Sequence, residues 1–420
     1  MLFRLQILCG LLLAGLAPLL LPVSAANDDP NHDMHNNNGG IVGGVVTLHD
    51  QNTMPRVGLG VALSFDQTYD AVRQALKAGY RLIDTAADDT YANQDLVGTA
   101  IRDWISESEG NSNSREDVFV TTKLWDDSHG FYPAVQALGQ SLRELAFHAD
   151  HNYIDLYLIH SPFGGRLMET WDAMVYLQKW GKIKSIGVSN FGIPHLELLR
   201  QSGRPMPVVN QIEMHPLVYH RRLELIQYCQ QHNIVVQAYG SILAGYPELL
   251  KAPRLVEMAE RYNKSAAQIL LKWALQHGFC IIPKSVRKER ILSNIDVYDF
   301  ELTPEDMNIL DDWGKEYAAD EREDENVLLY KESWNWNPID EANVEDDDSG
   351  TNHDNSYFAI QYKDVDTELV QRYLSADYQP SSSSRSGSTS SDDSDSDEEE
   401  EDSDDSDDAW GYDEYEGDEL

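Results

Sequence analysis

Apolar and polar positions alternate regularly along the chain from about residue 45. Short apolar runs rich in β-branched residues, typical of buried strands, are separated by longer stretches with the apolar period of amphipathic helices. The expected strands are residues 57–61, 82–84, 118–123, 153–159, 183–189, 208–213, 234–239 and 279–283. The expected helices are residues 66–78, 95–104, 131–145, 167–180, 193–200, 222–232, 253–262, 265–277 and 287–295.

Repeated strand–helix units predict a parallel sheet with helices outside and right-handed crossovers. Eight such units close into a barrel, so we expect the α/β class and a (β/α)8 TIM barrel over residues 45–313. Residues 48–55 are expected to form a hairpin over the barrel floor. A doubly wound open sheet is the alternative, but its first unit should carry a glycine-rich phosphate-binding turn, which this sequence lacks.

The segments around the barrel differ sharply from it in composition. The 420 residues carry a net charge of −40, much of it in residues 381–420, a Ser-, Asp- and Glu-rich tail expected to be disordered. Residues 27–44 are expected to be a disordered linker, and residues 314–380 an extension that either covers the barrel mouth or packs at its periphery. The charge argues against a nucleic-acid partner, whereas the tail suits weak Ca²⁺ binding.

The first residues have the features of a secretory signal peptide. Arg4 precedes an apolar run over residues 5–21, and small residues at 23–26 offer a cleavage site. We therefore predict a signal peptide over residues 1–26, with an uncleaved anchor as the alternative. No other run is long and apolar enough to span a bilayer, so no membrane span is expected after cleavage.

The last four residues, Gly-Asp-Glu-Leu, resemble endoplasmic-reticulum retrieval signals. With the signal peptide they predict residence in the endoplasmic reticulum lumen, with secretion as the alternative; an acidic tail can also end this way by chance. Asn263-Lys264-Ser265 is a glycosylation sequon, although Ser265 also suits the N-cap of the next helix. Cys229 and Cys280 lie in apolar segments and are predicted to be core thiols rather than a disulfide.

Polar or titratable residues stand at the ends of nearly all the expected strands. They are Asp84, Lys123, His160, Ser189, Asn190, Gln211, Tyr239, Lys284 and Ser285. The carboxyl ends of the strands of such a barrel form one face, and catalytic residues of barrel enzymes lie there. An acid, a lysine, a histidine and a phenol together on that face predict an active site, to which Tyr91 in the loop after Asp84 adds a second phenol.

Several longer motifs follow one another along the chain. The stretches RLIDTA, TTKLW, DLYLIHSP, GVSNF, NQIEMHP, AYGSI and IPKSVRKERI run from the second expected strand to the last expected helix. With them, the chain resembles the aldo-keto reductase family from about Leu48 to Trp313. The resemblance implies reduction of an aldehyde or ketone with NADPH, without a metal, by an enzyme that binds the cofactor first.

The resemblance implies a catalytic group of Asp84, Tyr91, Lys123 and His160, and physical chemistry supports each role. A phenol titrates near pH 10 and is too weak an acid unaided, so a nearby Lys123 ammonium is expected to lower the pKa of Tyr91. Asp84 would hold Lys123 charged and oriented, although a purely structural ion pair is the alternative. His160 would donate to the carbonyl oxygen and orient it.

The remaining candidate residues concern the cofactor and the substrate. The expected cofactor residues are Ser189, Asn190, Gln211 and Tyr239 at the nicotinamide and Lys284, Ser285, Arg290 and Asn294 at the 2′-phosphate and adenine. Cationic and hydroxyl donors suit a phosphate and favour NADPH over NADH. Ser293 stands where the family usually has Glu, which weakens the adenine contact. Trp125, like His160, is expected to contact the substrate, with a core role as the alternative.

One departure from the family concerns the expected acid. Tyr91 stands seven positions after Asp84, two more than is usual in the family, which implies a two-residue insertion among residues 87–90. A loop can absorb an insertion, but a small displacement of the phenol can strongly lower the rate of catalysis. The alternatives are therefore a cofactor-binding barrel without catalysis, or a lumenal calcium-buffering or interaction protein. We expect a small carbonyl substrate and a monomer.

Overall fold

The computed structural model describes residues 41–88, 91–107, 113–319 and 365–379. The predicted signal peptide, nearly all of the predicted linker, most of the predicted extension and the predicted acidic tail lie outside the described residues. No helix in the described ranges is long and apolar enough to cross a membrane.

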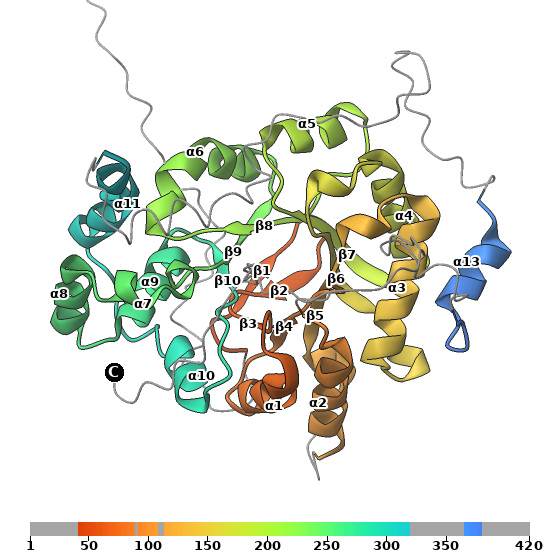
Figure 1. Ribbon diagram of the computed structural model, residues 1–420, viewed down its shortest axis with the longest axis horizontal. Coiled ribbons are helices and arrows are strands. Elements are labelled where there is room, and N and C mark those ends of the chain that lie inside the picture. The colour runs from red at the N-terminus through yellow and green to blue at the C-terminus, as the bar shows by residue number, and fades with distance from the viewer. Residues whose placement is uncertain (1–40, 89–90, 108–112, 320–364, 380–420) are drawn as a thin grey trace, which may run out of the picture. The chain divides into compact units, whose positions relative to one another are not determined.

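A parallel sheet of eight strands forms the centre of the fold (Figure 1). Its strands are β3 (Leu59–Gly60), β4 (Leu82–Asp84), β5 (Phe119–Leu124), β6 (Ile154–Ile159), β7 (Ile183–Ser189), β8 (Val209–Glu213), β9 (Val235–Tyr239) and β10 (Cys280–Ile281). They pair in chain order, and parallel bridges from Val57 to Ile281 and from Gly60 to Lys284 join the two edges. The sheet is therefore curled upon itself, and the α/β class with eight parallel strands is confirmed.

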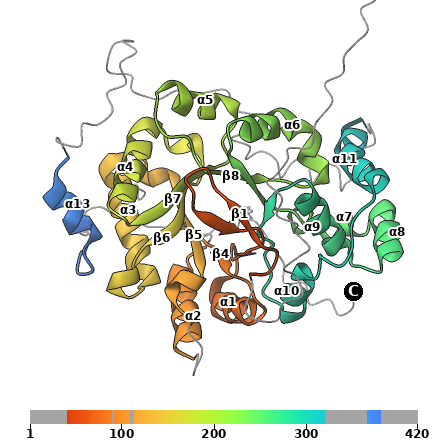
Figure 2. The ribbon, with the colours of Figure 1, turned by 180° about the vertical axis from the view of Figure 1, so that it is seen from behind.

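Helices surround the curled sheet on its outer face (Figures 1 and 2). They are α1 (Thr68–Lys77), α2 (Gln94–Ser106), α3 (Phe131–Leu145), α4 (Leu167–Lys179), α5 (Ile193–Gln201), α6 (Pro216–Gln231), α7 (Pro247–Leu250), α8 (Pro253–Tyr262), α9 (Ala266–Gln276), α10 (Lys288–Ile295) and α11 (Pro304–Ala319). In α3 the buried residues Ala134, Leu138 and Leu142 recur at helical spacing and face the core. Each fully buried aliphatic side chain contributes about 1.5–3 kcal/mol.

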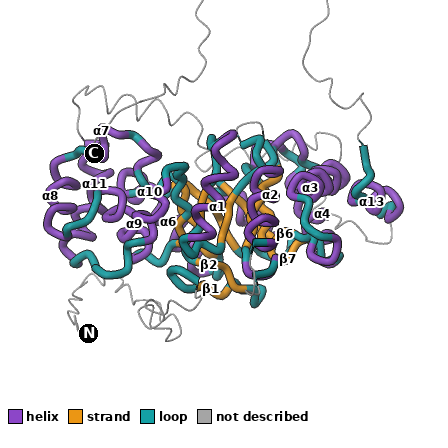
Figure 3. Tube along the Cα trace, turned by 90° about the horizontal axis from the view of Figure 1, so that it is seen from below, coloured by secondary structure: helices purple, strands orange, loops and turns teal. Residues whose placement is uncertain are grey.

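The hairpin lies at the end where the strands begin (Figure 3). Strands β1 (Val45–Thr47) and β2 (Thr53–Pro55) are antiparallel, so the predicted hairpin began too late and omitted its first strand. Asn52 Nδ2 donates to the backbone oxygen of Lys184 at 3.2 Å, near the start of β7. Leu48 and Met54 are fully buried and close the barrel interior from below, leaving the opposite face for the polar residues.

The two described thiols are structural. Cys229 on α6 and Cys280 on β10 are both buried and form no disulfide, as predicted. Burial raises the pKa of both thiols to about 12, so neither is ionised at neutral pH. Both side chains serve as core residues.

A helix of the predicted extension, α13 (Thr367–Leu374), packs against α3. Val370 is fully buried, and Arg143 of α3 donates to the backbone oxygen of Tyr373 at 2.8 Å, near the C-terminus of α13. Gly139 allows this close approach, because an added Cβ would lie 2.1 Å from the same oxygen. This part of the extension therefore lies on the outer side of the helix layer.

Candidate active site

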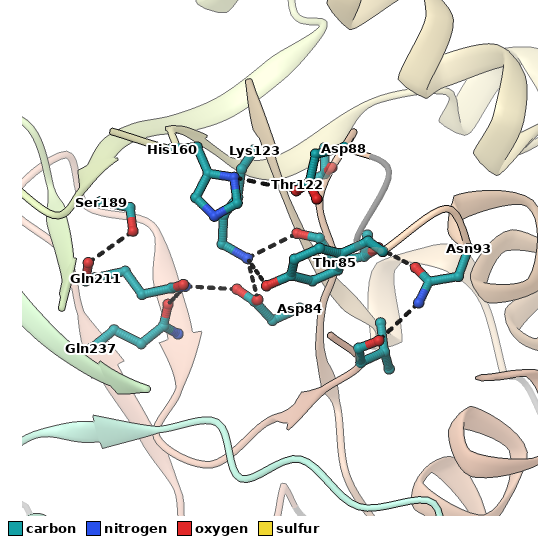
Figure 4. Close-up of polar contacts among 12 residues, drawn as sticks. Asp84, Thr85, Asp88, Asn93, Thr122, Lys123, His160, Ser189, Gln211 and Gln237 are labelled. Atoms are coloured by element: carbon teal, nitrogen blue, oxygen red, sulfur yellow. Dashed lines mark hydrogen bonds and ion pairs between the residues drawn. The ribbon is translucent and has the colours of Figure 1, made fainter. Parts of the chain in front are cut away.

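Three adjacent strands bring the predicted catalytic residues together (Figure 4). Asp84 ends β4, Lys123 lies near the end of β5, and His160 directly follows β6. Because the strands are parallel and neighbouring, their carboxyl ends lie at one level of the barrel. The alternation of side chains along each strand then turns these residues to the same face.

Lys123 is the centre of the site. Its Nζ donates to Asp84 Oδ1 at 2.6 Å, to the backbone oxygen of Thr85 at 3.0 Å and to Tyr91 Oη at 3.2 Å. The side chains of Lys123 and Asp84 are each only 1% exposed. Burial lowers the pKa of Lys123, but the Asp84 carboxylate and Tyr91 outweigh it and the net pKa is raised. Lys123 is therefore an ammonium held in a fixed position.

The loop that carries Tyr91 is anchored on both sides of the predicted insertion, of which residues 89 and 90 lie outside the described residues. The backbone nitrogens of Tyr91 and Ala92 donate to the backbone oxygen of Asp88 at 3.0 and 2.9 Å. Asn93, which is buried, accepts from Thr85 Oγ1 at 2.7 Å and donates to the oxygen of Val61 at 2.8 Å. With these contacts on both sides, the phenol lies within hydrogen-bond distance of Lys123.

The pKa of Tyr91 is raised rather than lowered, which corrects the expectation from the sequence. Burial of the phenol raises its pKa, and the nearby Lys123 ammonium opposes this without cancelling it. The sequence showed the charge next to the phenol but did not show how far the phenol is removed from water. Tyr91 consequently keeps its proton at neutral pH.

His160 and Trp125 border the space beside Tyr91. The ring centroid of His160 lies 6.1 Å from that of Tyr91 and 5.0 Å from that of Trp125. Burial, followed by the charge of Lys123, lowers the pKa of His160 well below its usual value. The imidazole is therefore neutral at physiological pH. Trp125 lies next to it, and its contact with the substrate stays a prediction.

A second carboxylate contact ties the site to the barrel interior. Gln211 Nε2 donates at 2.7 Å both to Asp84 Oδ2 and to Gln237 Oε1. Gln237 was missed by sequence reasoning, although an amide in the middle of the apolar run of β9 was an available signal. Together the two amides fix the Asp84 oxygen that does not face Lys123.

The predicted nicotinamide residues continue from His160 as one polar strip. Ser189 Oγ donates to the backbone oxygen of Gln211 at 2.9 Å, and Asn190 Nδ2 donates to the backbone oxygen of His160 at 3.0 Å. Tyr239 Oη donates to Asn190 Oδ1 at 2.9 Å. Hydroxyl and amide groups with an aromatic ring beside them have the chemistry that a carboxamide requires.

The predicted phosphate residues lie across the edge where the sheet closes. Gly60 pairs with Asp84 on one side and with Lys284 on the other, which places Lys284 at the level of the site. Lys284 and Arg290 are exposed, and neither forms an ion pair with any described residue. Ser285 and Asn294 are buried beside them. Two exposed cations without an ion pair among the described residues fit an anionic phosphate.

Comparison with known proteins agrees with this architecture. The sequence pattern of the aldo/keto reductase family matches residues 44–315. The chain is 39% identical over 282 residues to the glyoxal reductase of Bacillus subtilis, covering 67% of this chain and 96% of that protein. It is 42% identical over 270 residues to the 9,11-endoperoxide prostaglandin H2 reductase of Trypanosoma cruzi, covering 64% and 90%.

Solved structures give the same result. The Bombyx mori aldo-keto reductase in complex with NADP is 36% identical, with a TM-score of 0.58 over 64% of this chain and 91% of that one. An aldo/keto reductase from Brucella melitensis is 40% identical, with a TM-score of 0.56 over 64% and 98%. The chain therefore belongs to the aldo/keto reductase family and is an NAD(P)H-dependent oxidoreductase.

Proposed function

We propose that this protein reduces an aldehyde or ketone to an alcohol with NADPH, and that Tyr91 is the acid. The observation that carries the proposal is the contact of Tyr91 Oη with Lys123 Nζ at 3.2 Å, next to the buried Asp84. Bound NADPH supplies the hydride that reaches the carbonyl carbon. The carbonyl oxygen then needs a proton, and the Tyr91 hydroxyl is the group suited to give it.

The charge of Lys123 supports that proton transfer. Before the reaction Tyr91 is neutral, and its raised pKa keeps the proton in place. As the proton leaves, a phenolate forms within hydrogen-bond distance of the ammonium. Asp84 fixes Lys123 in advance, so little reorganisation is needed when the charge appears.

His160 and Trp125 complete the substrate side. Their rings lie edge to face, 5.0 Å apart between centroids, beside Tyr91. The neutral imidazole positions the carbonyl group, and the indole supplies an apolar wall. The Bacillus subtilis glyoxal reductase and the Escherichia coli methylglyoxal reductase among its relatives support a small carbonyl substrate.

The cations at the edge of the site support NADPH as the cofactor. Lys284 follows β10, and Arg290 lies in the first turns of α10. Both are exposed and without an ion pair in the part of the chain that the structure describes. They would hold the 2′-phosphate, with Ser285 as a hydroxyl donor and Asn294 near the adenine.

Consumption of NADPH with small aldehydes tests the proposal. Wild-type protein should oxidise NADPH in step with formation of the corresponding alcohol, identified by gas chromatography. Lys123→Met should abolish turnover, because it removes the charge that stabilises the phenolate. Absence of alcohol with wild-type protein that binds NADPH tightly would instead support a cofactor-binding protein without catalysis.

We also propose that Asn263 carries a glycan when the chain enters the secretory pathway. Asn263 is exposed at the turn between α8 and α9, with a left-handed backbone at φ 52°. Ser265 of the sequon caps α9 by accepting from the backbone nitrogen of Gln268 at 3.3 Å, so both roles expected of Ser265 are compatible. Treatment with an endoglycosidase should shift the wild-type band on a gel and leave Asn263→Gln unchanged.

A further inference from the structure

The proposed proton transfer does not use one amide of the barrel interior, Gln237. This residue lies in the middle of β9, and its side chain is fully buried. Next to it begins the apolar cluster that closes the barrel from below, which includes Leu48 and Met54. Gln237 Nε2 donates to the sulfur of Met54 at 3.8 Å, and a thioether is a weak acceptor. Burial of an amide with so weak a partner costs stability, which indicates that the oxygen at its other end serves a purpose.

The oxygen of Gln237 holds the amide of Gln211 (Figure 4). The two residues are partners in the register of β8 and β9, and Gln211 Nε2 donates to Gln237 Oε1 at 2.7 Å. The same nitrogen donates to Asp84 Oδ2 at 2.7 Å. Because the Asp84 carboxylate, which is paired with Lys123, only accepts hydrogen bonds, the nitrogen of the Gln211 amide must face it. Both hydrogens of that amide are therefore used inside the protein.

This arrangement leaves the oxygen of Gln211 as the group that can meet a ligand. Among the described residues no donor bonds to Gln211 Oε1. The amide nitrogen of the neighbouring Asn190 is already used, since it donates to the backbone oxygen of His160 at 3.0 Å and to Ser189 Oγ at 3.1 Å. A fixed oxygen recognises the NH₂ end of a carboxamide, so these residues fit the nicotinamide group.

We propose that Gln237 is a positioning residue for the cofactor, because it fixes the plane of the Gln211 amide so that Gln211 Oε1 accepts from the NH₂ group of the nicotinamide carboxamide. Two acceptors at one nitrogen define the plane of the amide, whereas Asp84 alone would let the amide rotate about the remaining hydrogen bond. Gln237 acts through Gln211 and does not itself contact the cofactor. The inference rests on the proposed function, because it takes Gln211 to bind the nicotinamide.

Gln237→Met is the test variant, because methionine has a similar length and fills the space without a strong acceptor. It should raise the dissociation constant for NADPH by about tenfold, the effect of one misplaced hydrogen bond. The dissociation constant for adenosine 2′,5′-bisphosphate should stay unchanged, because this molecule carries the 2′-phosphate and the adenine but no nicotinamide. Isothermal titration calorimetry measures both constants.

Gln237→Glu is the matched control, because it keeps a carbonyl oxygen at the same position. Burial and the nearby Asp84 carboxylate should keep the new carboxyl group protonated, so Gln211 retains both of its acceptors. The dissociation constant for NADPH should therefore stay within about twofold of the wild-type value. An unchanged constant for NADPH in Gln237→Met, or an equal rise in the constant for the bisphosphate, would overturn the inference.

Single turnovers with saturating NADPH separate this inference from the proposed function. Gln237→Met should transfer hydride about tenfold more slowly than wild type, because the nicotinamide is less well placed, while the aldehyde concentration at half-maximal rate should stay the same. If wild-type protein binds NADPH but reduces no carbonyl, the proposed function fails, and the two dissociation constants still decide the role of Gln237. If wild-type protein binds NADPH no more tightly than the bisphosphate, the nicotinamide contact is absent and the inference fails.

Discussion

The two sides of the site are built in opposite ways. On the proton-transfer side, Lys123 and Asp84 are almost completely buried, and Lys123 bonds to three neighbouring groups. On the phosphate side, Lys284 and Arg290 are exposed and form no ion pair with any residue of the described ranges. The cations of one side are paired within the protein, whereas the proposed role of the other two is to bind the cofactor's phosphate.

This difference predicts which property a substitution on each side of the site should alter. Buried charges that share one network depend on each other, so removing one partner leaves the other uncompensated. Exposed cations are already solvated, so removing one costs the fold little and costs the ligand its contact. Substitutions on the buried side should therefore affect stability and rate, and those on the exposed side cofactor affinity.

The largest expected effect on stability comes from Asp84→Asn. It leaves the Lys123 ammonium buried without its carboxylate and should lower the free energy of unfolding by about 3–5 kcal/mol. Combining it with Lys123→Met should recover much of this loss without restoring turnover, because the charge is then gone from the core. Urea unfolding of the two variants measures the effect; equal losses in both would show that the two charges are not coupled.

Arg290→Ala removes one of the exposed cations and should weaken the binding of NADPH. Loss of a charge-assisted contact should raise the dissociation constant for NADPH by about tenfold to a hundredfold. The dissociation constant for NADH should barely change, since NADH has no 2′-phosphate. Fluorescence titration measures both, with the exposed Lys251→Ala as a control; a parallel loss for NADH would place Arg290 at another part of the cofactor.

Asp126→Asn probes a half-buried acid whose charge the fold disfavours. Burial raises its pKa from 3.8 to about 6, so the folded chain binds the proton more tightly than the unfolded chain. Ionisation therefore costs stability above pH 6, and the cost disappears below pH 3.8. The variant should be more stable than wild type by about 1 kcal/mol at neutral pH and equal to it in acid. Unfolding curves at the two pH values check this; a variant that is less stable at neutral pH contradicts it.

Gly139→Leu should have the smallest effect on catalysis. A side chain at this position meets the backbone of Tyr373, so α13 should leave α3 and the free energy of unfolding should fall by only about 1 kcal/mol. The turnover rate should stay unchanged, because α13 lies outside the helix layer. Trypsin should cleave faster at Arg372 in this variant than in Gln140→Leu, which alters the exposed neighbour on α3. A large loss of turnover would link α13 to the site.

Much of this fold followed from local pattern. The strands β4 and β7 and the helices α3 and α8 have the predicted bounds, because each combines a clear apolar period with an abrupt end. The start of α6 was placed at residue 222, but the helix begins at Pro216, whose role at the first turn the pattern of apolar residues did not show.

The site was harder to predict where it depends on distant contacts. Strand ends located Asp84 and Lys123, since parallel strands place such residues on one face. The position of Tyr91 depends on Asn93, which is fixed by Thr85 and Val61 from two other segments. The raised pKa of Tyr91 likewise follows from burial, which is a property of the whole fold.

The rate of a single turnover in Tyr91→Phe tests the central claim most directly. NADPH is bound first, its affinity is measured by fluorescence quenching, and the reaction is started by adding an aldehyde. We expect unchanged affinity for NADPH and a rate of oxidation lower by about a hundredfold to ten-thousandfold, the usual contribution of a general acid. A variant that binds NADPH normally and oxidises it at the wild-type rate would show that another group gives the proton.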